Sequence, residues 1–395
     1  MPSSIPVQVI VSKDVSSPVT LSNKVSARIQ DHFVTLTDPR RRKVIYPLVN
    51  IVTIAICAVI CGADDFVSIA EYGRQKRKWL GQFLDLSAGI PSHDRFNAIL
   101  GAIQPAEFEK CLLSWITALH EVTHGQVVAI DGKTLRRSFD TATSKSAIHM
   151  VSAWATANCI TLGQVVVDEK SNEITAIPKL LEVLELSDCL VTIDAMGCQT
   201  EIAKKIVDGG ADYVLAAKGN QPALHDGIED FFARHQANDF ADVKVRRYET
   251  RERGHGREDT RMYFVCPAPD DLPDRRRWKD LAAIGMAINE TLRDGKQTTE
   301  VRYYILSRKL TAREFAAAVR GHWSIENRLH WQLDVTFGED QSRIRKGHAD
   351  ANFSILRRTA LSLLKNNHTL KVGVKNKRLS AAWCDDYLAQ VLFGE

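Results

Sequence analysis

The sequence lacks paired cysteines, a membrane-length apolar run and a signal peptide. Its eight cysteines, at positions 57, 61, 111, 159, 189, 198, 266 and 384, include no Cys-x-x-Cys pair, and most lie within apolar runs, so we expect buried free thiols in a reducing compartment. The most apolar segment, residues 48–63, contains Asn50 and is shorter than the roughly 20 residues that cross a bilayer. The first residues, MPSSIPVQVIVSKDVSS, have no basic head followed by an apolar stretch. These absences predict a cytoplasmic protein without a membrane partner.

The chain also has no internal repeat and no low-complexity tract, and its charge is nearly balanced. It has 52 Lys and Arg against 48 Asp and Glu, and its hydrophobic content of 45% is ample for a sizeable core. Basic residues are nevertheless concentrated, as RRRK at 40–43, as RQKRK at 74–78 and as ten Lys or Arg against one acid in 341–380. Such blocks fit a polyanionic partner, and the alternative, solvated helix faces, stays open.

The N-terminal part of the chain divides into two regions. Residues 1–25 are rich in Ser and Val without a helical period, which predicts a flexible arm. Helical patterns then continue over 26–120, where we expect a helical DNA-binding or associated domain. Within it, Ser92 or Asp94 can cap a short helix, HDRFNAIL, whose polar front could be a DNA-reading element.

From residue 121 to residue 395 the pattern becomes that of an α/β fold. Strands are predicted at 127–131, 147–156, 160–167, 189–194 and 212–217, and helical stretches separate the later ones. A polar segment at 243–265 predicts two strands around a Gly-His-Gly turn, and the β pattern continues at 281–290 and 297–307. We therefore expect a β-rich insertion at about 240–306, followed by a long helix that begins near Thr311.

Two of the predicted strands end in an aspartate, Asp131 in AIDGKT and Asp194 in TIDAMG. The carboxyl edge of an α/β sheet is where such folds bind ligands, although a strand-ending Asp is also a common helix cap. Two carboxylates at neighbouring strand ends repel each other unless a cation lies between them, and Mg²⁺ or Mn²⁺ is the natural occupant. A pair of such ions roughly 4 Å apart can assist the displacement of a phosphodiester and needs a further acidic ligand.

The segment HWSIENRLHW, residues 322–331, supplies a candidate for that ligand. Residues four apart share a helix face, so His322, Glu326 and His330 are expected to line up, with Trp323 one step behind. Glu326 is the only acid on this face. If the face turns toward the two aspartates, Glu326 completes a three-carboxylate metal site, and the imidazoles and indoles can hold DNA backbone or a displaced base.

Two alternatives to this site stay open. One is an ordinary amphipathic helix with its tryptophans in the core and Glu326 paired to Arg320 or Arg328. The other treats His322, Glu326 and His330 as zinc ligands of a metallohydrolase. In that case the His-to-His spacing of eight is poorer than the usual spacing of four, and the two aspartates would have no role.

The motifs AIDGKTLR, TIDAMGCQ, LAAKGNQP, GHGREDTR and HWSIENRLHWQLDVTFGED, in this order, resemble the DDE transposases of bacterial insertion sequences, specifically the ISAs-type group that includes the H-repeat-associated proteins. The resemblance extends from about residue 30 to the C-terminus. It implies a ribonuclease-H-like catalytic core in which Asp131, Asp194 and Glu326 form the catalytic triad and bind two Mg²⁺ or Mn²⁺ ions.

The same resemblance implies an activity and its partners. The activity is metal-dependent cleavage and strand transfer of double-stranded DNA, both the element's terminal inverted repeats and the target DNA. A homodimer is expected because two ends must be brought together. Relatives carry Tyr, Arg and Lys at positions matching Val319, His322 and Leu333 here, which leaves the processing of the second strand open. Trp323 and Arg320 could substitute in part, by stacking and phosphate contact. The alternative function is that of a catalytically inactive or repurposed DNA-binding relic.

Further basic, amide and aromatic residues near these motifs are expected to contact DNA. Lys133 and Lys218 follow strand ends and are expected to meet phosphates, whereas Arg357 and Arg358 are expected on the surface of a helix that packs on the core. For each candidate, a surface salt bridge is the alternative. The full set is Lys133, Lys218, Asn220, Gln221, His255, Arg257, Arg261, Arg320, His322, Trp323, His330, Arg357 and Arg358.

Overall fold

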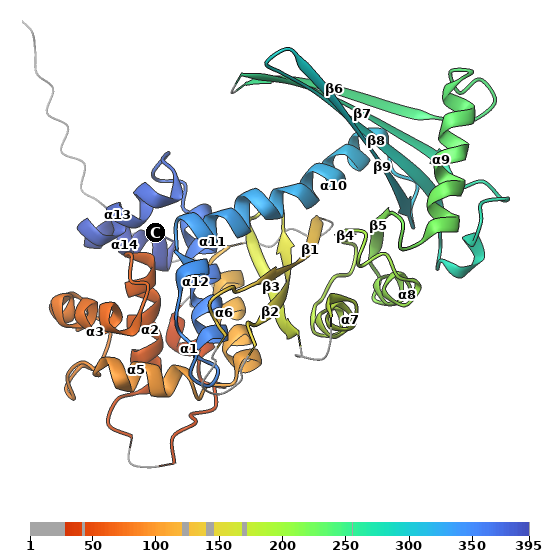
Figure 1. Ribbon diagram of the computed structural model, residues 1–395. Coiled ribbons are helices and arrows are strands. Elements are labelled where there is room, and N and C mark those ends of the chain that lie inside the picture. The colour runs from red at the N-terminus through yellow and green to blue at the C-terminus, as the bar shows by residue number, and fades with distance from the viewer. Residues whose placement is uncertain are drawn as a thin grey trace, which may run out of the picture.

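The computed structural model describes residues 28–41, 44–120, 126–139, 146–167, 172–254 and 256–394 (Figure 1), so the arm expected at 1–25 lies outside the described residues. None of the helices in these parts of the chain has the length and apolar character that a membrane crossing requires. The helices are α1 (Ile29–His32), α2 (Leu48–Ile60), α3 (Phe66–Gln75), α4 (Arg77–Leu80), α5 (His93–Leu100), α6 (Pro105–Leu119), α7 (Glu173–Val183), α8 (Thr200–Asp208), α9 (Pro222–Gln236), α10 (Ala312–Ile325), α11 (Trp331–Val335), α12 (Ala349–Asn366), α13 (Val374–Trp383) and α14 (Asp385–Phe393). Short 3-10 turns, η1 (Arg275–Arg277) and η3 (Glu339–Gln341), and a π-turn, η2 (Glu326–His330), complete the helical elements.

In the described parts of the chain, nine strands form one sheet in the order β3-β2-β1-β4-β5-β9-β8-β7-β6. They are β1 (Val127–Thr134), β2 (His149–Ala155), β3 (Ile160–Val167), β4 (Leu190–Ile193), β5 (Asp212–Ala217), β6 (Arg246–Gly254), β7 (Arg257–Pro267), β8 (Ala283–Arg293) and β9 (Lys296–Leu306). β1 to β3 form an antiparallel meander, whereas β4 lies parallel to both β1 and β5. The mixed α/β fold class and all nine predicted strands are confirmed.

The four strands β6 to β9, here called the blade, extend the sheet beyond β5. Residues 303–306 of β9 pair antiparallel with residues 214–217 of β5, and the blade strands then follow one another as antiparallel neighbours. Beyond that short junction the blade projects away from the rest of the sheet, above α10 in Figure 1. The predicted insertion is therefore an extension of the central sheet and not a separate β domain.

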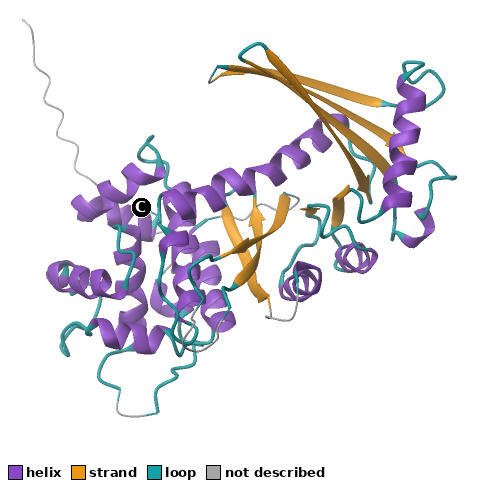
Figure 2. Ribbon diagram, in the orientation of Figure 1, coloured by secondary structure: helices purple, strands orange, loops and turns teal. Residues whose placement is uncertain are grey.

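The sheet separates two layers of helices (Figure 2). On one face, α7, α8 and α9 bury apolar residues against β1, β4, β5 and the lower blade. On the other face, Phe315 and Val319 of α10 pack on β5 and the blade. A Cβ added at Gly285 of β8 would lie 2.6 Å from the Phe315 ring, so only glycine allows this close approach. α10 is thereby fixed across the sheet at the strand ends that carry the aspartates.

The helices α1–α6 and α12–α14, here called the helical body, lie together at one end of the sheet (Figure 1). α12 is at its centre, and the other helices surround it. All the regular elements described between residues 29 and 119 are helices. Their apolar residues share one core with α12, with Trp154 of β2 and with Leu329 and Leu333 next to the π-turn. Sequence-distant ends of the chain therefore support the segment that carries Glu326.

The basic segment 341–380 is partly internal. Four of its ten cationic residues are buried, namely Arg357, Arg358, Lys377 and Arg378. Lys377 Nζ donates to the carbonyls of Leu364 and Asn367 at the end of α12, at 2.9 and 2.6 Å, and Arg378 Nη2 donates to Val59 O at the end of α2, at 2.9 Å. Cations at these positions satisfy helix C-terminal carbonyls. Part of the basic excess therefore stabilises the fold.

Arg357 and Arg358 do not reach the surface where we expected them. Each is 2% exposed, because α12 is covered on all sides. The Arg358 guanidinium lies 3.1 Å from Glu339 Oε1, and the Arg357 guanidinium lies 4.4 Å from the centre of the Phe353 ring. The prediction that they lie on a DNA-facing surface is wrong, because the helix that carries them has no solvent-exposed side in its middle turns.

We expect Glu339→Gln to destabilise the fold by about 3–5 kcal/mol, because it leaves Arg358 as an uncompensated buried charge. Burial would raise the pKa of Glu339, but the charges of Arg358, Lys133 and Arg357 lower it to about 2. A depressed folded-state pKa gives stability that is present above the unfolded value and is lost as the pH falls. The difference in the free energy of unfolding between the wild type and Glu339→Gln should therefore shrink by about 1 kcal/mol between pH 7 and pH 4.

Urea unfolding at both pH values measures this difference. The matched control is Glu71→Gln, which removes the exposed Arg74 pair and should cost less than about 1 kcal/mol. An equally small cost for Glu339→Gln would contradict a structural role for the buried pair.

Candidate functional site

Asp131 and Asp194 lie side by side where the parallel pairing of β1 with β4 ends. Asp194 directly follows β4, whereas β1 continues beyond Asp131 to Thr134, three residues past the strand end that the sequence predicted. Ile130 of β1 is paired with Ile193 of β4 in parallel register, so the two aspartates that follow them are neighbours. Asp194 Oδ1 accepts hydrogen bonds from the backbone N–H groups of Met196 and Gly197, at 3.0 and 3.4 Å. One oxygen of Asp194 is thus fixed by the turn after the strand.

Glu326 reaches this edge from α10. Thr311 and Glu314 form a capping box that starts the helix where the sequence predicted it. The predicted regular helix is interrupted, however, by the π-turn of residues 326–330, which adds a residue to one turn. At the two ends of this turn, which differs from the sequence prediction, Glu326 lines the cavity and His330 lies against Asp131, so both side chains face the sheet.

The three carboxylates line one cavity of about 210 Å³. Its walls also include Thr192, Lys218 and His322, and the opening is flanked by Trp323 of α10 and Arg302 and Tyr304 of β9. Within the described residues Glu326 forms no ion pair, and Arg320 is paired with Glu252 at 2.5 Å. The alternative in which Glu326 serves as the partner of Arg320 is therefore wrong.

Electrostatics in this cavity reflect crowded negative charge. Burial raises the pKa of Asp194, and the charges of Asp131 and Glu173 raise it further, against a hydrogen bond from the Gly197 N–H. Burial lowers the pKa of His322, although the carboxylates of the cavity oppose that shift. His322 is thus favoured as a neutral imidazole, with Nδ1 3.3 Å from the Thr192 hydroxyl. A divalent cation would relieve the repulsion that raises the pKa of Asp194.

The donor set fits a hard divalent ion, because all three acids offer carboxylate oxygens. The ligand oxygens of the three acids do not all lie within 4.8 Å of one another. They are therefore too far apart for all three to bind one ion in this arrangement. Nor do His322, Glu326 and His330 form such a group, so the zinc alternative gains no support from the described residues. His330 instead lies with Nε2 3.2 Å from Asp131 Oδ2.

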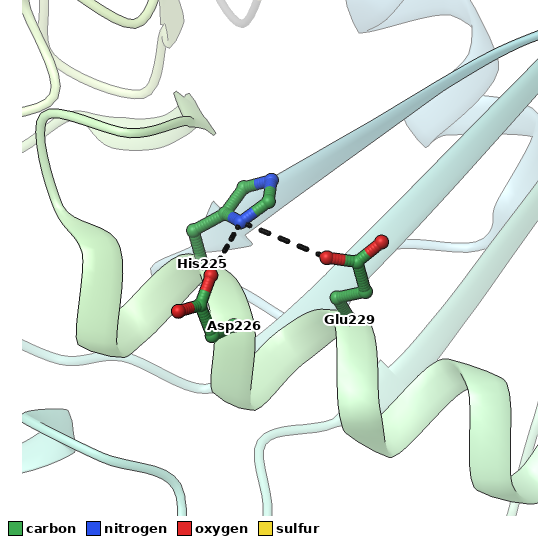
Figure 3. Close-up of side chains that lie close together, drawn as sticks. All are labelled: His225, Asp226 and Glu229. Atoms are coloured by element: carbon green, nitrogen blue, oxygen red, sulfur yellow. Dashed lines mark hydrogen bonds and ion pairs between the residues drawn. The ribbon is translucent and has the colours of Figure 1, made fainter.

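The one compact group of possible metal ligands in the described parts of the chain lies elsewhere, on α9 (Figure 3). His225 Nδ1 lies 3.1 Å from Asp226 Oδ1 and 4.0 Å from Glu229 Oε2, and the His225 ring contacts Tyr303 edge-on. Both carboxylates are exposed on a helix surface. The contacts within the group account for its geometry without an ion.

Lys133 lies in an acidic environment on the same face of β1 as Asp131. Its side chain is 9% exposed, its ammonium contacts Asp334, and it lies 3.5 Å from Glu339 Oε2 and 3.7 Å from Asp340 Oδ1. The expectation that Lys133 extends toward phosphates is not met in this arrangement. Lys218, in contrast, is exposed and lines the carboxylate cavity.

Asn220 and Gln221 hold the loop that follows Asp194. Asn220 Nδ2 donates to Ala195 O at 2.6 Å, and Gln221 Nε2 donates to Cys198 O at 3.1 Å. These amide donors, expected to meet bases or sugars, are used within the protein. They tie the end of β5 to the loop after β4, so they restrain the position of Asp194.

A second, larger cavity of about 610 Å³ lies between α10 and the blade and shares Arg302, Tyr304 and Trp323 with the first. The Arg302 guanidinium stacks 3.7 Å from the centre of the Trp323 ring. Arg257 and Arg320 also line it. The larger cavity therefore adjoins the carboxylate cavity, and cationic and aromatic side chains line the part that the two share.

The blade arginines in this region are paired with acids. Arg261 contacts Glu252 and Asp259, each at 2.8 Å, and Arg257 lies 3.2 Å from Asp259. The hydrogen bond from Arg320 is the main cause that lowers the pKa of Glu252. His255, the remaining candidate on this hairpin, lies outside the described residues. The predicted basic cluster is therefore an alternating network of charges.

The sequence did not reveal Thr192, Arg302 and Tyr304 as parts of the site. The one sequence signal for the β9 residues is a period-two pattern, which places Glu300, Arg302 and Tyr304 on the same face of the strand. That pattern could not reveal which face turns toward α10, because β9 pairs with β5 only at its last residues.

Two family models match the chain. Residues 123–363 match the family model described as "Transposase DDE domain", and residues 30–116 match the model described as "DDE_Tnp_1-associated". The first match covers every strand of the sheet and both cavities. The second covers most of the helices that surround α12.

Individual relatives are similar over most of the chain. The chain is 42% identical over 367 residues to "Putative transposase YncI" of Escherichia coli O157:H7, which covers 92% of this chain and 93% of that protein. It is 40% identical over 373 residues to "H repeat-associated putative transposase YhhI" of Escherichia coli K12, which covers 93% and 98%. It is also 40% identical to "Uncharacterized protein in dhlA 3'region" of Xanthobacter autotrophicus, over 70% of this chain and 92% of that protein.

We expect Asp194→Asn to stabilise the protein in the absence of metal and to remove its response to Mn²⁺. A raised pKa means that the charged carboxylate costs stability above that pKa, so the cost is present at pH 7 and the amide removes it. The amide oxygen can still accept from Met196 N. Mn²⁺ at 100 times its Kd should stabilise the wild type by about 2.7 kcal/mol.

Thermal unfolding with and without Mn²⁺ measures both effects. Asp208→Asn, at an exposed acid on α8, is the control and should respond to Mn²⁺ as the wild type does. A full Mn²⁺ response in Asp194→Asn would show that Asp194 is no metal ligand.

Proposed function

Because the chain belongs to the DDE transposase family, we propose that it binds the ends of an insertion sequence and catalyses metal-dependent strand cleavage and strand transfer. Asp131, Asp194 and Glu326 are the proposed catalytic triad. The observation that carries this proposal is that three acids separated by 63 and 132 residues in the chain line a single cavity, at the carboxyl edge of the sheet. Family membership alone implies DNA partners and dependence on divalent metal.

The strand order supports a ribonuclease-H-like core for the catalytic part. A three-stranded antiparallel meander, β3-β2-β1, continues into the parallel strands β4 and β5, with helices on both faces. We propose that residues 121–395 form this catalytic part with the blade as its insertion. The helical residues 26–120 are proposed as a DNA-binding or associated part.

In the proposed mechanism, Asp131, Asp194 and Glu326 would hold two divalent ions, Mg²⁺ or Mn²⁺, in the cavity that they line. When bound, such ions polarise the phosphodiester and stabilise the charge that develops on the attacking and leaving oxygens. Water attacks phosphorus, the bond to the 3′ oxygen breaks, and that oxygen takes up a proton. The freed 3′-hydroxyl then attacks a phosphodiester of target DNA by the same displacement.

Several side chains of the site serve this reaction without touching the ions. His322, neutral and restrained by Thr192, closes the cavity beside Glu326. Asn220 and Gln221 restrain the Asp194 loop through backbone carbonyls. Lys218 is the exposed cation in the cavity wall and is positioned for a phosphate.

The DNA path is proposed along the larger cavity between α10 and the blade. Trp323 is 41% exposed and offers a ring for stacking, with Arg302 on one side of it. Arg257, Arg261 and Arg320 are proposed to contact phosphates there. For Arg320 the exchange of Glu252 for a phosphate costs little because that pair is exposed, whereas Arg257 and Arg261 would keep their contact with the buried Asp259. A homodimer is proposed because one copy holds a single carboxylate cavity and two element ends must be processed.

Replacing Asp131 or Glu326 with Ala is expected to lower cleavage of a terminal-repeat DNA by more than about 100-fold, since loss of outer-shell partners alone costs 10–100-fold. DNA binding should stay within about threefold. The assay is nicking of labelled DNA in Mn²⁺ together with a gel shift, and Glu201→Gln, an exposed acid on α8, is the control. Binding without cleavage by the wild type would favour the inactive relic, and cleavage by both Ala variants would refute the triad.

Trp323→Ala is expected to weaken binding of a DNA end with an unpaired terminal base by about 1–3 kcal/mol, because one stacked base is lost. Trp383→Ala is the matched control, since Trp383 is 76% exposed on α13, outside both cavities. Fluorescence anisotropy on the two variants compares the losses directly. Equal losses would mean that stacking at Trp323 contributes nothing specific.

A further inference from the structure

Lys133 is surrounded by protein acids in a way that a phosphate-binding lysine would not be. Its ammonium contacts Asp334 and lies within 4 Å of Glu339 and Asp340. Glu339 is itself held by Arg358 at 3.1 Å and by the Ser354 hydroxyl at 2.7 Å. The ammonium is therefore the central cation of a cluster whose far side is anchored in buried α12.

This cluster joins the two elements that carry catalytic acids. Lys133 is two residues after Asp131, on the same face of β1, because side chains alternate along a strand. Asp334 is eight residues after Glu326, in the helix that continues from the π-turn. A second contact, His330 to Asp131, joins the same two elements one turn earlier. Strand and helix are thus bridged twice beside the carboxylate cavity.

The need for such a bridge follows from charge. Asp131 and Glu326 face the same cavity, and like charges in a partly buried site repel. Without a cation, this repulsion would push the π-turn and α11 away from β1. An ion pair between Lys133 and Asp334 opposes that separation with an attraction between the same two elements, in surroundings that screen it less than open water does.

We propose that Lys133 is a positioning residue, whose ion pair with Asp334 holds the Glu326 segment against β1 so that the carboxylate cavity is preformed for divalent ions. The proposal rests on the proposed function of that cavity. Lys133 touches neither DNA nor the reacting atoms. Its loss weakens metal binding because part of the binding free energy must then bring Glu326 and Asp131 together.

The experiment compares Lys133→Met, Asp334→Asn and the double variant in the full-length protein. Mn²⁺ binding without DNA is measured by the electron paramagnetic resonance signal of the free ion. Lys133→Met is expected to weaken Mn²⁺ binding about 10-fold, within the 10–100-fold range of outer-shell losses, and the double variant should be no weaker than Lys133→Met. Fully additive losses, or unchanged Mn²⁺ affinity in Lys133→Met, would overturn the proposal.

A matched ion pair elsewhere provides the control. Lys205 of α8 pairs with Glu182 of α7 on the surface, so Lys205→Met removes a lysine–carboxylate pair without touching the cavity. Its Mn²⁺ affinity should equal that of the wild type. Lys133→Arg keeps the charge and should recover most of the lost affinity, and circular dichroism identifies any variant that fails to fold. If Lys133→Met fails to fold, the Mn²⁺ affinities of Asp334→Asn and Lys133→Arg test the proposal. Weakened binding by Asp334→Asn with near wild-type binding by Lys133→Arg supports it, and unchanged binding by Asp334→Asn overturns it.

Two further measurements separate this role from phosphate contact and from failure of the proposed function. The salt dependence of DNA binding should keep its slope in Lys133→Met, and a slope smaller by about 1 would show a phosphate contact and overturn the proposal. Cleavage by Lys133→Met should approach the wild-type rate at saturating Mn²⁺. Mn²⁺ binding without any cleavage by the wild type contradicts the proposed function alone, whereas absence of Mn²⁺ binding contradicts both.

Discussion

The close approach of three carboxylates is the constraint on which the rest of this structure depends. The register of β1 with β4 brings Asp131 beside Asp194, and α10 must then bring Glu326 to the same edge against electrostatic repulsion. Three features hold α10 and the segment after it at this edge: a glycine in β8 that admits Phe315, a π-turn that begins at Glu326, and an ion-pair cluster around Lys133. Burial is the main cause of the raised pKa of Asp194, and repulsion from Asp131 and Glu173 adds to it.

Part of the positive charge of this protein is buried and stabilises the fold. A basic segment such as 341–380 would be assigned to DNA from its composition, yet its buried members satisfy the carbonyl ends of helices or neutralise Glu339. Helix termini gathered around one buried helix leave many acceptors without water. Lysine and arginine are the side chains long enough to reach several of them at once. Counting charges along the sequence therefore overestimates the surface available to a polyanion.

Much of the architecture could be predicted from the sequence, because periodicity and strand-end residues are local signals. The strands that carry Asp131 and Asp194 and the capped start of α10 belong to this group. The π-turn could not be predicted, since no composition distinguishes it from a regular helix. The partners of Lys133 and Arg358 could not be predicted either, because each pair joins residues far apart in sequence.

The attachment of the blade has a mechanical consequence. Only residues 303–306 of β9 join it to β5, while α10 packs on β6 and β7 on its way to Glu326. The remaining seven residues of β9, at about 3.3 Å each, extend roughly 20 Å past that junction. α10 bridges that junction, because it packs on β1, β4 and β5 as well as on the blade. The position of the third carboxylate therefore depends on how the blade is set against the central strands.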